Sequence, residues 1–359
     1  MSKRALVPPQ KPGRERPSQT PREIFEYLDR YVVGQERAKR AIAIAAYNHV
    51  KRCAQPKDKR VIKKANLLLV GPTGCGKTHL ARNLADCLKV PFIVADATEY
   101  TEAGYYGKDV EVMIAELLLK SGHSIEDTQR GIVFIDEIDK IARRSQGARN
   151  GAGSRDIGGE GVQQALLKLL EGREIFVPLN VTQHWNKHDF VQVDTGDILF
   201  IAAGTFSDLS MYAEGDKTIG VVGGGAASEK KRKPVGGKEL TDYGMLPELL
   251  GRLPVIVELD ALGEDQLIEV LSGPPDSLLR EYQALLAADD VTLEFADAAL
   301  REIVRFAVAR RVGARGLRGI VEEVCHDLMF EAPERRGETV MVDRDWVRER
   351  LARSERSDR

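Results

Sequence analysis

The sequence predicts an α/β protein in which a parallel-sheet domain is followed by a smaller, α-rich domain. Before Pro254, short apolar runs alternate with helical stretches, which is typical of a parallel sheet covered by helices on both faces. A glycine-rich stretch, Gly71–Thr78, separates the first of these runs from a helix. After Pro254 the pattern becomes mostly helical. The length of 359 residues is enough for two domains.

Capping residues and apolar spacing predict the first elements. Residues 1–19 are rich in Pro and in basic side chains and are expected to form a disordered tail. Thr20 is a predicted N-cap, with Pro21 at the first and Glu23 at the third helical position. Apolar spacing predicts a second helix over Gln35–Arg52. Strands are then expected at Asn66–Val70, Pro91–Val94, Ile132–Ile135 and Ile198–Ala202, and helices from Lys77 and at Asp109–Lys120 and Gly161–Leu170.

The change of pattern at Pro254 gives the domain boundaries. A large domain is expected over residues 20–253 and a small domain over 254–352, followed by a C-terminal tail at 353–359. Residues 207–237 are rich in Gly and Lys and lack periodicity, which is typical of a functional or disordered loop. Helices of the small domain are predicted at Glu264–Leu271, Ser277–Ala288, Asp297–Arg310 and Ala314–Met329.

The composition narrows the class of protein. The 53 Lys and Arg residues and 55 Asp and Glu residues give a net charge of −2, whereas general nucleic-acid binders are usually basic. The apolar runs are too short to cross a bilayer, and Met1–Thr20 does not resemble a signal peptide. The four cysteines form no CxxC pair, which argues against disulfides and zinc. The sequence therefore predicts a soluble cytoplasmic protein without membrane or nucleic-acid partners.

The glycine-rich stretch is a nucleotide-binding motif. It fits the pattern GxxxxGK[ST] and stands between a strand and a helix, as this motif requires. Its backbone N–H groups can point at phosphates, Lys77 can reach the β- and γ-phosphates, and Thr78 can bind Mg²⁺. A thiol at this helix N-terminus, two residues from Lys77, predicts a lowered pKa and a reactive Cys75, with an inert small residue as the alternative. The residues predicted to bind ATP here are Gly71, Pro72, Thr73, Gly74, Cys75, Gly76, Lys77, Thr78 and His79.

A second motif supplies two carboxylates. The apolar strand that begins at Ile132 ends in Asp136 and Glu137, and the carboxyl end of a central strand opens at the nucleotide crevice. Asp136 is predicted to hold Mg²⁺ together with Thr78, and Glu137 to polarise the attacking water. Alone, a strand that ends in two acidic residues is weak support for a nucleotide hydrolase. Its position after the phosphate loop makes this support strong. Together the two motifs predict an ATP hydrolase.

Further stretches narrow the kind of hydrolase. Tyr31–Gln35, Gly104–Gly107, Gly251-Arg252 and Gly313–Arg318 together resemble the ring-forming AAA+ ATPases, and among them the ClpX family of protein unfoldases. The resemblance runs from about Thr20 to about Val342. It is strongest over Arg130–Lys140, Gly159–Gly172 and Leu246–Pro254. It implies an AAA+ nucleotide-binding domain, a homo-hexameric ring, Mg-ATP as cofactor and a ClpP-type peptidase as partner.

The resemblance also implies roles for single residues at the nucleotide. Val32 and Val33 would pack on the adenine. Arg252 would be an arginine finger that reaches the γ-phosphate bound to a neighbouring subunit, where it stabilises charge as the phosphoryl bond breaks. Arg315, in the small domain of the same subunit, would sense that phosphate. With Glu137, these two arginines are the predicted catalytic residues.

Three loops would handle substrate and peptidase. The resemblance implies that Tyr105 and Tyr106 form a pore loop, whose aromatic rings can grip a chain of any sequence. Arg155 falls where the family has a second pore loop. Residues 207–237 would be the peptidase-docking loop, with Ile219, Gly220 and Val221 at its tip.

Three features depart from the family. Only a short tail precedes Thr20 and no Cys precedes Cys53, so a member without the N-terminal four-cysteine zinc domain is expected. Gln183-His184-Trp185 stands where the family has Arg-Lys-His, which leaves the preference for a substrate tag open. Val221 replaces the Phe or Leu of the docking loop.

The predicted function is ATP-dependent unfolding and translocation of unfolded or tagged proteins through a hexameric pore, with delivery to ClpP. One alternative is a stand-alone remodelling chaperone with weak or no peptidase coupling. A more distant one is an AAA+ nucleic-acid motor, in which basic residues rather than Gly-Tyr-Tyr-Gly would line the pore. A ring that does not hydrolyse ATP is disfavoured by Lys77, Glu137 and Arg252.

Overall fold

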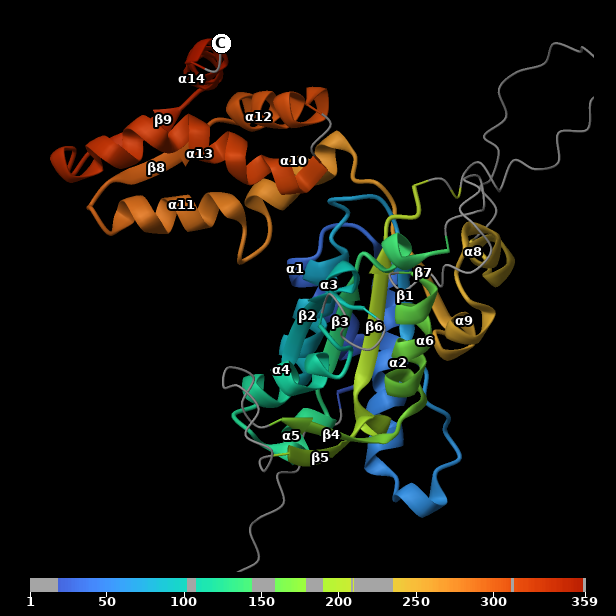
Figure 1. The fold of residues 1–359 in the computed structure, drawn as a ribbon. Helices are drawn as coiled ribbons and strands as arrows, with labels where there is room; N and C mark the ends of the chain where they lie inside the picture. Colours follow the sequence, from blue (N-terminus) through green and yellow to red (C-terminus); the bar gives the residue numbers. More distant parts are fainter. Residues whose placement is uncertain are drawn as a thin grey trace, which may run out of the picture.

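The computed structural model describes residues 19–101, 108–143, 159–178, 190–207, 209, 235–310 and 313–357. Figure 1 shows a domain built on one parallel sheet, followed by a second, mainly helical domain that contains α10 to α14. The two-domain α/β architecture predicted from the sequence is confirmed. None of the helices in the described ranges is long and apolar enough to cross a membrane.

The large domain is built on a five-stranded parallel sheet with the strand order β2-β3-β6-β1-β7. The four predicted strands are confirmed. The fifth, β7, lies directly after Pro254, where helices were expected, and its four residues pair with β1. The sheet therefore continues beyond residue 253, the predicted end of the large domain. The strands are β1 Leu67–Val70, β2 Phe92–Asp96, β3 Ile132–Asp136, β6 Leu199–Gly204 and β7 Val255–Glu258.

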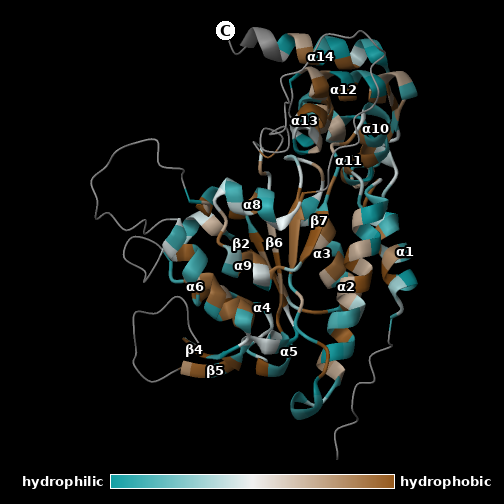
Figure 2. Cartoon of the chain, turned by 90° about the vertical axis from the view of Figure 1, so that its right-hand side faces the viewer, coloured by the Kyte–Doolittle hydropathy of each residue, from teal (hydrophilic) through white to brown (hydrophobic). Residues whose placement is uncertain are grey.

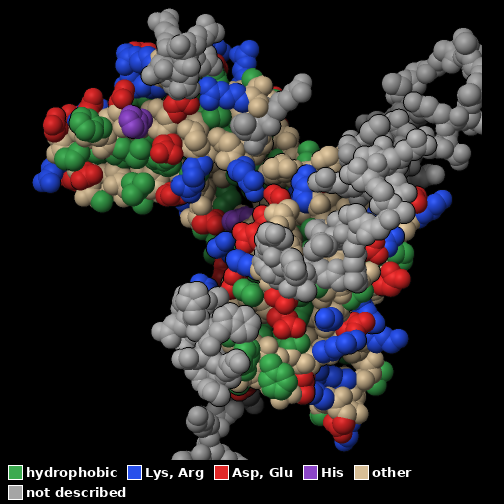
Figure 3. Space-filling model, in the orientation of Figure 1, with side chains coloured by type: hydrophobic (Ala, Val, Ile, Leu, Met, Phe, Trp, Pro, Cys, Tyr) green, Lys and Arg blue, Asp and Glu red, His purple; other side chains and the backbone are tan. Residues whose placement is uncertain are grey.

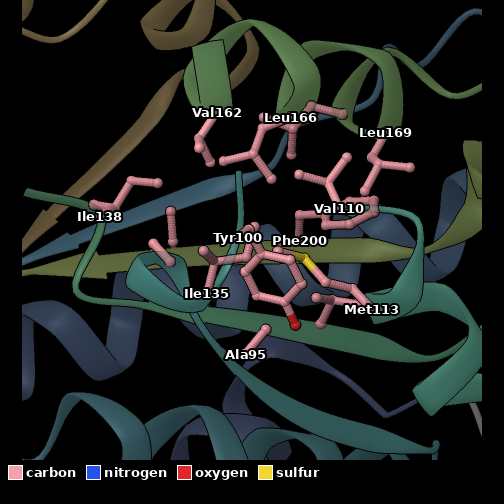
Figure 4. Packing of buried hydrophobic residues seen from close by; sticks show 14 of the residues in the cluster. Ala95, Tyr100, Val110, Met113, Ile135, Ile138, Val162, Leu166, Leu169 and Phe200 are labelled. Atoms are coloured by element: carbon pink, nitrogen blue, oxygen red, sulfur yellow. The ribbon is translucent and has the colours of Figure 1, made fainter. Parts of the chain in front are cut away.

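Helices cover both faces of the sheet because successive strand side chains point to opposite faces. Leu67 and Leu69 pack with α1, α2 and α3, whereas Leu68 and Val70 pack with α4, α6 and α9. In Figure 2 the hydrophobic strands lie between these two groups of helices. Figure 4 shows the second face, where Tyr100 and Phe200 meet side chains from α6. The helices are α1 Pro21–Tyr31, α2 Glu36–Ala54, α3 Lys77–Leu88, α4 Val112–Lys120, α6 Glu160–Glu171 and α9 Pro247–Arg252.

The predicted start of α1 is confirmed in detail. The Thr20 hydroxyl accepts a hydrogen bond from the Glu23 N–H at 3.3 Å, and the Glu23 carboxylate accepts one from the Thr20 N–H at 2.6 Å. This capping box satisfies two N–H groups that the first helical turn leaves unpaired.

Some elements of the large domain carry no strong local signal and were not predicted. β4 (Glu174–Pro178) and β5 (Phe190–Asp194) form an antiparallel pair at the end of the sheet where its strands begin. The short helices α5 (Ile125–Gln129) and α8 (Gly237–Tyr243) are also new.

The small domain packs its helices around a separate core that includes Leu271, Ile303 and Val321. All four predicted helices are confirmed, as α10 Glu264–Ser272, α11 Leu278–Ala287, α12 Asp297–Ala309 and α13 Gly313–Glu331. A parallel pair of strands, β8 (Thr292–Phe295) and β9 (Thr339–Val342), was not predicted. The last helix, α14 (Arg344–Ser357), extends through most of the residues expected to form a tail.

Candidate nucleotide-binding site

The strand order brings three loops together at the carboxyl edge of the sheet. β6 lies between β1 and β3, and the register aligns Val70 with Gly204. The Gly71 N–H donates to the Gly204 carbonyl at 3.2 Å, so the loop after β1 starts against the loop after β6. In an open parallel sheet, ligands bind at this edge, where the strand order reverses. The two predicted nucleotide motifs therefore meet in one place.

The loop after β1 has the backbone shape that phosphate binding needs. Gly74 and Gly76 adopt positive φ angles of +79° and +96°, which glycine tolerates without strain. Helix α3 begins directly afterwards, at Lys77, so its first N–H groups face the loop. This geometry can hold an anionic phosphate chain with backbone donors.

Lys77 supplies the positive charge of this loop. Its side chain is buried, and its ammonium group donates to the carbonyls of Gly71 at 2.6 Å and Pro72 at 3.0 Å. Both acceptors are neutral, and among the described residues no carboxylate pairs with this charge. Phosphate oxygens are stronger acceptors for an ammonium group than carbonyls are. The observed position of Lys77 thus fits a nucleotide phosphate chain.

The groups predicted to hold a metal ion lie together. The Thr78 hydroxyl, on α3, donates to the Asp136 carboxylate, at the end of β3, at 3.2 Å. The other oxygen of Asp136 accepts from the N–H of Glu137 at 2.9 Å. A hydroxyl beside a carboxylate is the set of oxygen ligands that Mg²⁺ prefers beside phosphates. The donor set therefore fits Mg²⁺.

Glu137 leaves the line of its strand. It adopts a left-handed backbone conformation, with φ +56°, and its side chain is exposed. A non-glycine residue in this conformation is uncommon, and such residues gather at functional sites. The Glu137 carboxylate is therefore accessible to solvent at the end of β3, while the Asp136 carboxylate bonds the Thr78 hydroxyl.

The structure adds Thr205 and Asp139 to the site, and the sequence analysis missed both. The Thr205 hydroxyl lies 3.5 Å from that of Thr73 in the phosphate loop, and the Thr205 N–H donates to the Asp139 carboxylate at 3.2 Å. Asp139 is buried and also accepts from the N–H of Phe206 at 3.4 Å. The available signal was a hydroxyl residue just after a buried strand, but the strand order was needed to interpret it.

The segment predicted to contact adenine is braced by side chains from two helices. His79 Nε2 lies 3.1 Å from the Tyr31 carbonyl, and the Lys39 ammonium donates to the Val32 carbonyl at 3.1 Å. Lys39 is itself buried and paired with the Asp29 carboxylate. Val32 and Val33 are both buried. The backbone of this segment is therefore held in one conformation beside the first turn of α3.

The predicted lowering of the pKa of Cys75 is wrong. The Cys75 side chain is only 3% exposed, and burial raises the pKa of its thiol, although Lys77 acts in the opposite direction. A Cβ atom at Gly71 would lie 3.2 Å from the Cys75 sulfur, so the thiol packs against the backbone of its own loop. Desolvation outweighs the nearby charge because the thiolate would lose its hydration. The inert small residue, the alternative interpretation, fits this structure.

The small domain approaches the phosphate loop. A Cβ atom added at Gly74 would lie 3.2 Å from the Ala314 nitrogen and 3.6 Å from the Arg315 nitrogen, at the start of α13. His79 Nε2 lies 3.9 Å from a carboxylate oxygen of Asp276, which also belongs to the small domain. Figure 3 shows charged side chains of both signs where the two domains face each other. The structure thus places Arg315 beside the loop, with its side chain exposed.

Arg252 lies at the opposite edge of the sheet. Its carbonyl accepts from the Asn66 amide at 2.9 Å, and Asn66 directly precedes β1, whereas the phosphate loop directly follows β1. The guanidinium of Arg252 donates to the Glu171 carboxylate at 3.1 Å and is half exposed. The four residues of β1 rise about 13 Å in total, so the two ends of the strand are far apart. The structure does not bring Arg252 to the other site residues of its own chain.

Several predicted residues lie outside the described parts of the chain. These are the pore residues Tyr105, Tyr106 and Arg155, the docking residues Ile219, Gly220 and Val221, and the segment Gln183-His184-Trp185. Their roles stay predictions.

Comparison with known proteins identifies related families for both domains. Residues 62–256 match the AAA domain of the Cdc48 subfamily, and residues 262–341 match the C-terminal, D2-small domain of ClpB protein. The chain is 45% identical over 316 residues to the ATP-dependent Clp protease ATP-binding subunit ClpX 2 of Wolinella succinogenes, a match that covers 88% of this chain and 78% of that protein. It is 42% identical over 333 residues to the ATP-dependent Clp protease ATP-binding subunit ClpX of Treponema denticola, covering 90% of this chain and 80% of that protein.

Proposed function

The chain belongs to the ClpX family of AAA+ ATPases, and on this basis we propose that it is an ATP-driven protein unfoldase. It works as a homo-hexameric ring that pulls unfolded or tagged proteins through a central pore and delivers them to a ClpP-type peptidase. The observation that carries the proposal is the meeting of Lys77, Thr78, Asp136 and Glu137 at one edge of the sheet. The cytoplasmic location stays a prediction.

The chain's residues suit hydrolysis of Mg-ATP. Lys77 would exchange its carbonyl acceptors for phosphate oxygens, and Thr78 and Asp136 would hold the metal ion. Bound Mg²⁺ supplies charge neutralisation at the phosphates. Glu137, whose side chain is exposed, would accept the proton of the attacking water. Thr205, held by Asp139, offers its hydroxyl beside the phosphate loop.

A ring completes each site with a neighbour's arginine. Because Arg252 lies at the far edge of the sheet from its own phosphate loop, it can stabilise a transferring phosphate only in another subunit. A head-to-tail arrangement of subunits presents one edge of each sheet to the other edge of the next. Arg315, beside Gly74 of its own chain, couples the bound phosphates to the small domain.

Degradation of a tagged, fluorescent substrate tests the whole proposal, with ClpP present and absent. Tyr105→Ala is expected to leave ATP hydrolysis within about twofold of normal while unfolding of a stable substrate fails, because an aromatic grip is lost and the nucleotide site is not. Tyr47→Phe, which alters a half-buried tyrosine on α2, is the matched control. Equal loss of both activities in Tyr105→Ala would mean that Tyr105 supports the fold instead of the pore.

Val221 favours a second candidate, a stand-alone remodelling chaperone. Replacing Phe or Leu by Val removes one or more buried carbon groups, at about 0.8 kcal/mol for each CH₂, and several docking loops bind at once. Weak coupling to a standard ClpP is therefore expected, with rescue by Val221→Phe. Degradation is measured as a function of ClpP concentration. If the unmodified protein and Val221→Phe both unfold substrate but neither supports degradation at any ClpP concentration, the result supports the stand-alone chaperone.

A further inference from the structure

Gln35 joins the nucleotide-binding segment to the connection between the two domains. Its carboxamide nitrogen donates to the Asp260 carbonyl at 2.7 Å, and its oxygen accepts from the Asp260 N–H at 3.0 Å. The same nitrogen lies 3.5 Å from the carbonyl of Cys75, in the phosphate loop. The side chain is buried. One amide therefore touches the backbone of the phosphate loop and of the interdomain connection.

The local sequence does not explain this use of Gln35. Gln35 is the N-cap residue of α2, yet its side chain makes no capping bond to that helix. It adopts a left-handed conformation with φ +57°, directly after Gly34 at φ +62°. At an N-cap, a side-chain oxygen usually bonds to the first turn of its own helix. Here the amide is directed at Asp260 instead, 225 residues away in the chain.

Asp260 is the point at which the chain leaves the sheet. The Leu259 N–H donates to the Val70 carbonyl at 2.8 Å, which ends the pairing of β7 with β1, and α10 begins at Glu264. Gln35 bonds both backbone groups of Asp260 as a strand partner would. Because so few residues separate Asp260 from α10, the direction in which the chain leaves Asp260 sets the orientation of the small domain.

The same segment contacts the small domain a second time. Gly34 packs so closely on the side chain of Gln266, in the first turn of α10, that an added Cβ atom would clash with the Gln266 amide nitrogen. The Gln266 oxygen in turn accepts from the N–H of Gly263 at 3.0 Å, in the connection. Gly34 and Gln35 thus contact both the start and the end of the interdomain connection.

We propose that Gln35 is a positioning residue that sets the angle of the small domain according to the state of the nucleotide site. A shift of Val32 and Val33, which are predicted to pack on adenine, or of the phosphate loop moves the Gln35 amide, and Asp260 moves with it. This inference rests on the proposed function, since it needs a bound nucleotide. It assigns to the Gln35 amide a share of the coupling between nucleotide and domain angle, beside the share of Arg315.

Two variants test the role of the amide. Gln35→Met keeps the length of the side chain and removes both bonds to Asp260. Gln35→Glu keeps the acceptor for the Asp260 N–H and loses the donor to the Asp260 carbonyl. It therefore provides a second test, with one of the two bonds intact, if Gln35→Met does not fold. Gln164→Met is the matched control, because Gln164 is an exposed glutamine on α6 whose amide bonds Glu160.

The distance between the domains is the direct readout. Nitroxide labels at Lys59→Cys and Glu334→Cys, in a Cys53→Ser background, report this distance by pulsed electron resonance with labelled subunits diluted among unlabelled ones. ADP is expected to shift the distance in the unmodified protein and in the Gln164→Met control. In Gln35→Met the distribution should broaden and the shift should fall by about threefold or more, with a smaller loss in Gln35→Glu. An undiminished shift in Gln35→Met overturns the inference.

Kinetics separates positioning from binding. Gln35→Met should lower kcat for ATP about tenfold while KM changes by less than about threefold, because Gln35 bonds the interdomain connection and not the nucleotide. A change confined to KM overturns the inference. A protein that shows the ADP-dependent shift, and loses it in Gln35→Met, but unfolds no substrate would refute the proposed function alone. Substrate unfolding together with an intact shift in Gln35→Met would refute only the role of Gln35.

Discussion

The location of Arg252 leads to a quantitative prediction about mixed rings. The phosphate loop follows β1 and Arg252 is bonded at the residue before β1, so about 13 Å of strand separates the two within one subunit. Each active site is therefore expected to take Glu137 from one subunit and Arg252 from the next. Glu137→Gln removes the group that activates water, and Arg252→Ala removes the finger. Each variant alone should lose at least about 10³-fold in kcat.

Mixing the two variants should restore activity. When equal amounts of the two proteins are unfolded and assembled together, a site is intact only if an Arg252→Ala subunit supplies Glu137 and its neighbour, a Glu137→Gln subunit, supplies Arg252. Random assembly produces this arrangement at about one quarter of the sites, so about a quarter of normal turnover is expected. The assay is steady-state release of phosphate, with fluorescent ADP binding as a check that both variants still bind nucleotide.

A control and a contrary result complete the test. Arg173→Ala is the matched control, because Arg173 donates to the same Glu171 carboxylate at 2.6 Å and should tolerate removal within about twofold. If mixed rings hydrolyse ATP no faster than the two variants apart, each site is built within one subunit and the shared site is refuted. Normal ATP turnover by rings that contain only Arg252→Ala subunits would show that Arg252 is not an arginine finger.

Three further predictions follow from the described contacts. Gly74→Ala should weaken ADP binding at least about tenfold, since φ is +79° and the new Cβ would lie 3.2 Å from the Ala314 nitrogen; Gly319→Ala, with open space around its Cβ, should bind normally in the same fluorescence titration. Cys75 should react slowly with alkylating agents in the folded protein, as measured by mass spectrometry, and Cys75→Ser should stay active; rapid labelling that nucleotide prevents would contradict the buried thiol. Burial lowers the pKa of His49 to about 4, so the stability held by neutral His49 is complete above the unfolded pKa of 6.5 and is lost as the pH falls toward 4. That loss amounts to ~3 kcal/mol. Over this pH range the melting temperature of His49→Leu should therefore fall less than that of the unmodified protein. An equal fall in both proteins would show that other groups cause the acid sensitivity.

Much of the fold could be predicted from the sequence because its signals are local. The capping box at Thr20 and Glu23, the buried strand before Gly71 and the helix that begins at Lys77 each depend on residues a few positions apart. Backbone conformation and amphipathic burial respond to such short patterns. The phosphate loop was predicted for the same reason, since its glycines and its lysine act within one turn of the chain.

Only the tertiary structure decided how these pieces work together. Cys75 was misjudged because charge and helix position are visible in the sequence, whereas the burial that raises the pKa of its thiol comes from residues distant in the chain. Thr205 and Asp139 became site residues because β6 lies between β1 and β3, an order that no local pattern records. The bond between Gln35 and Asp260 could not be predicted for the same reason, because the two residues are 225 positions apart in the chain. Short patterns determine the elements and their motifs, but packing determines which groups lose water and which loops meet, because both depend on residues far apart in the chain.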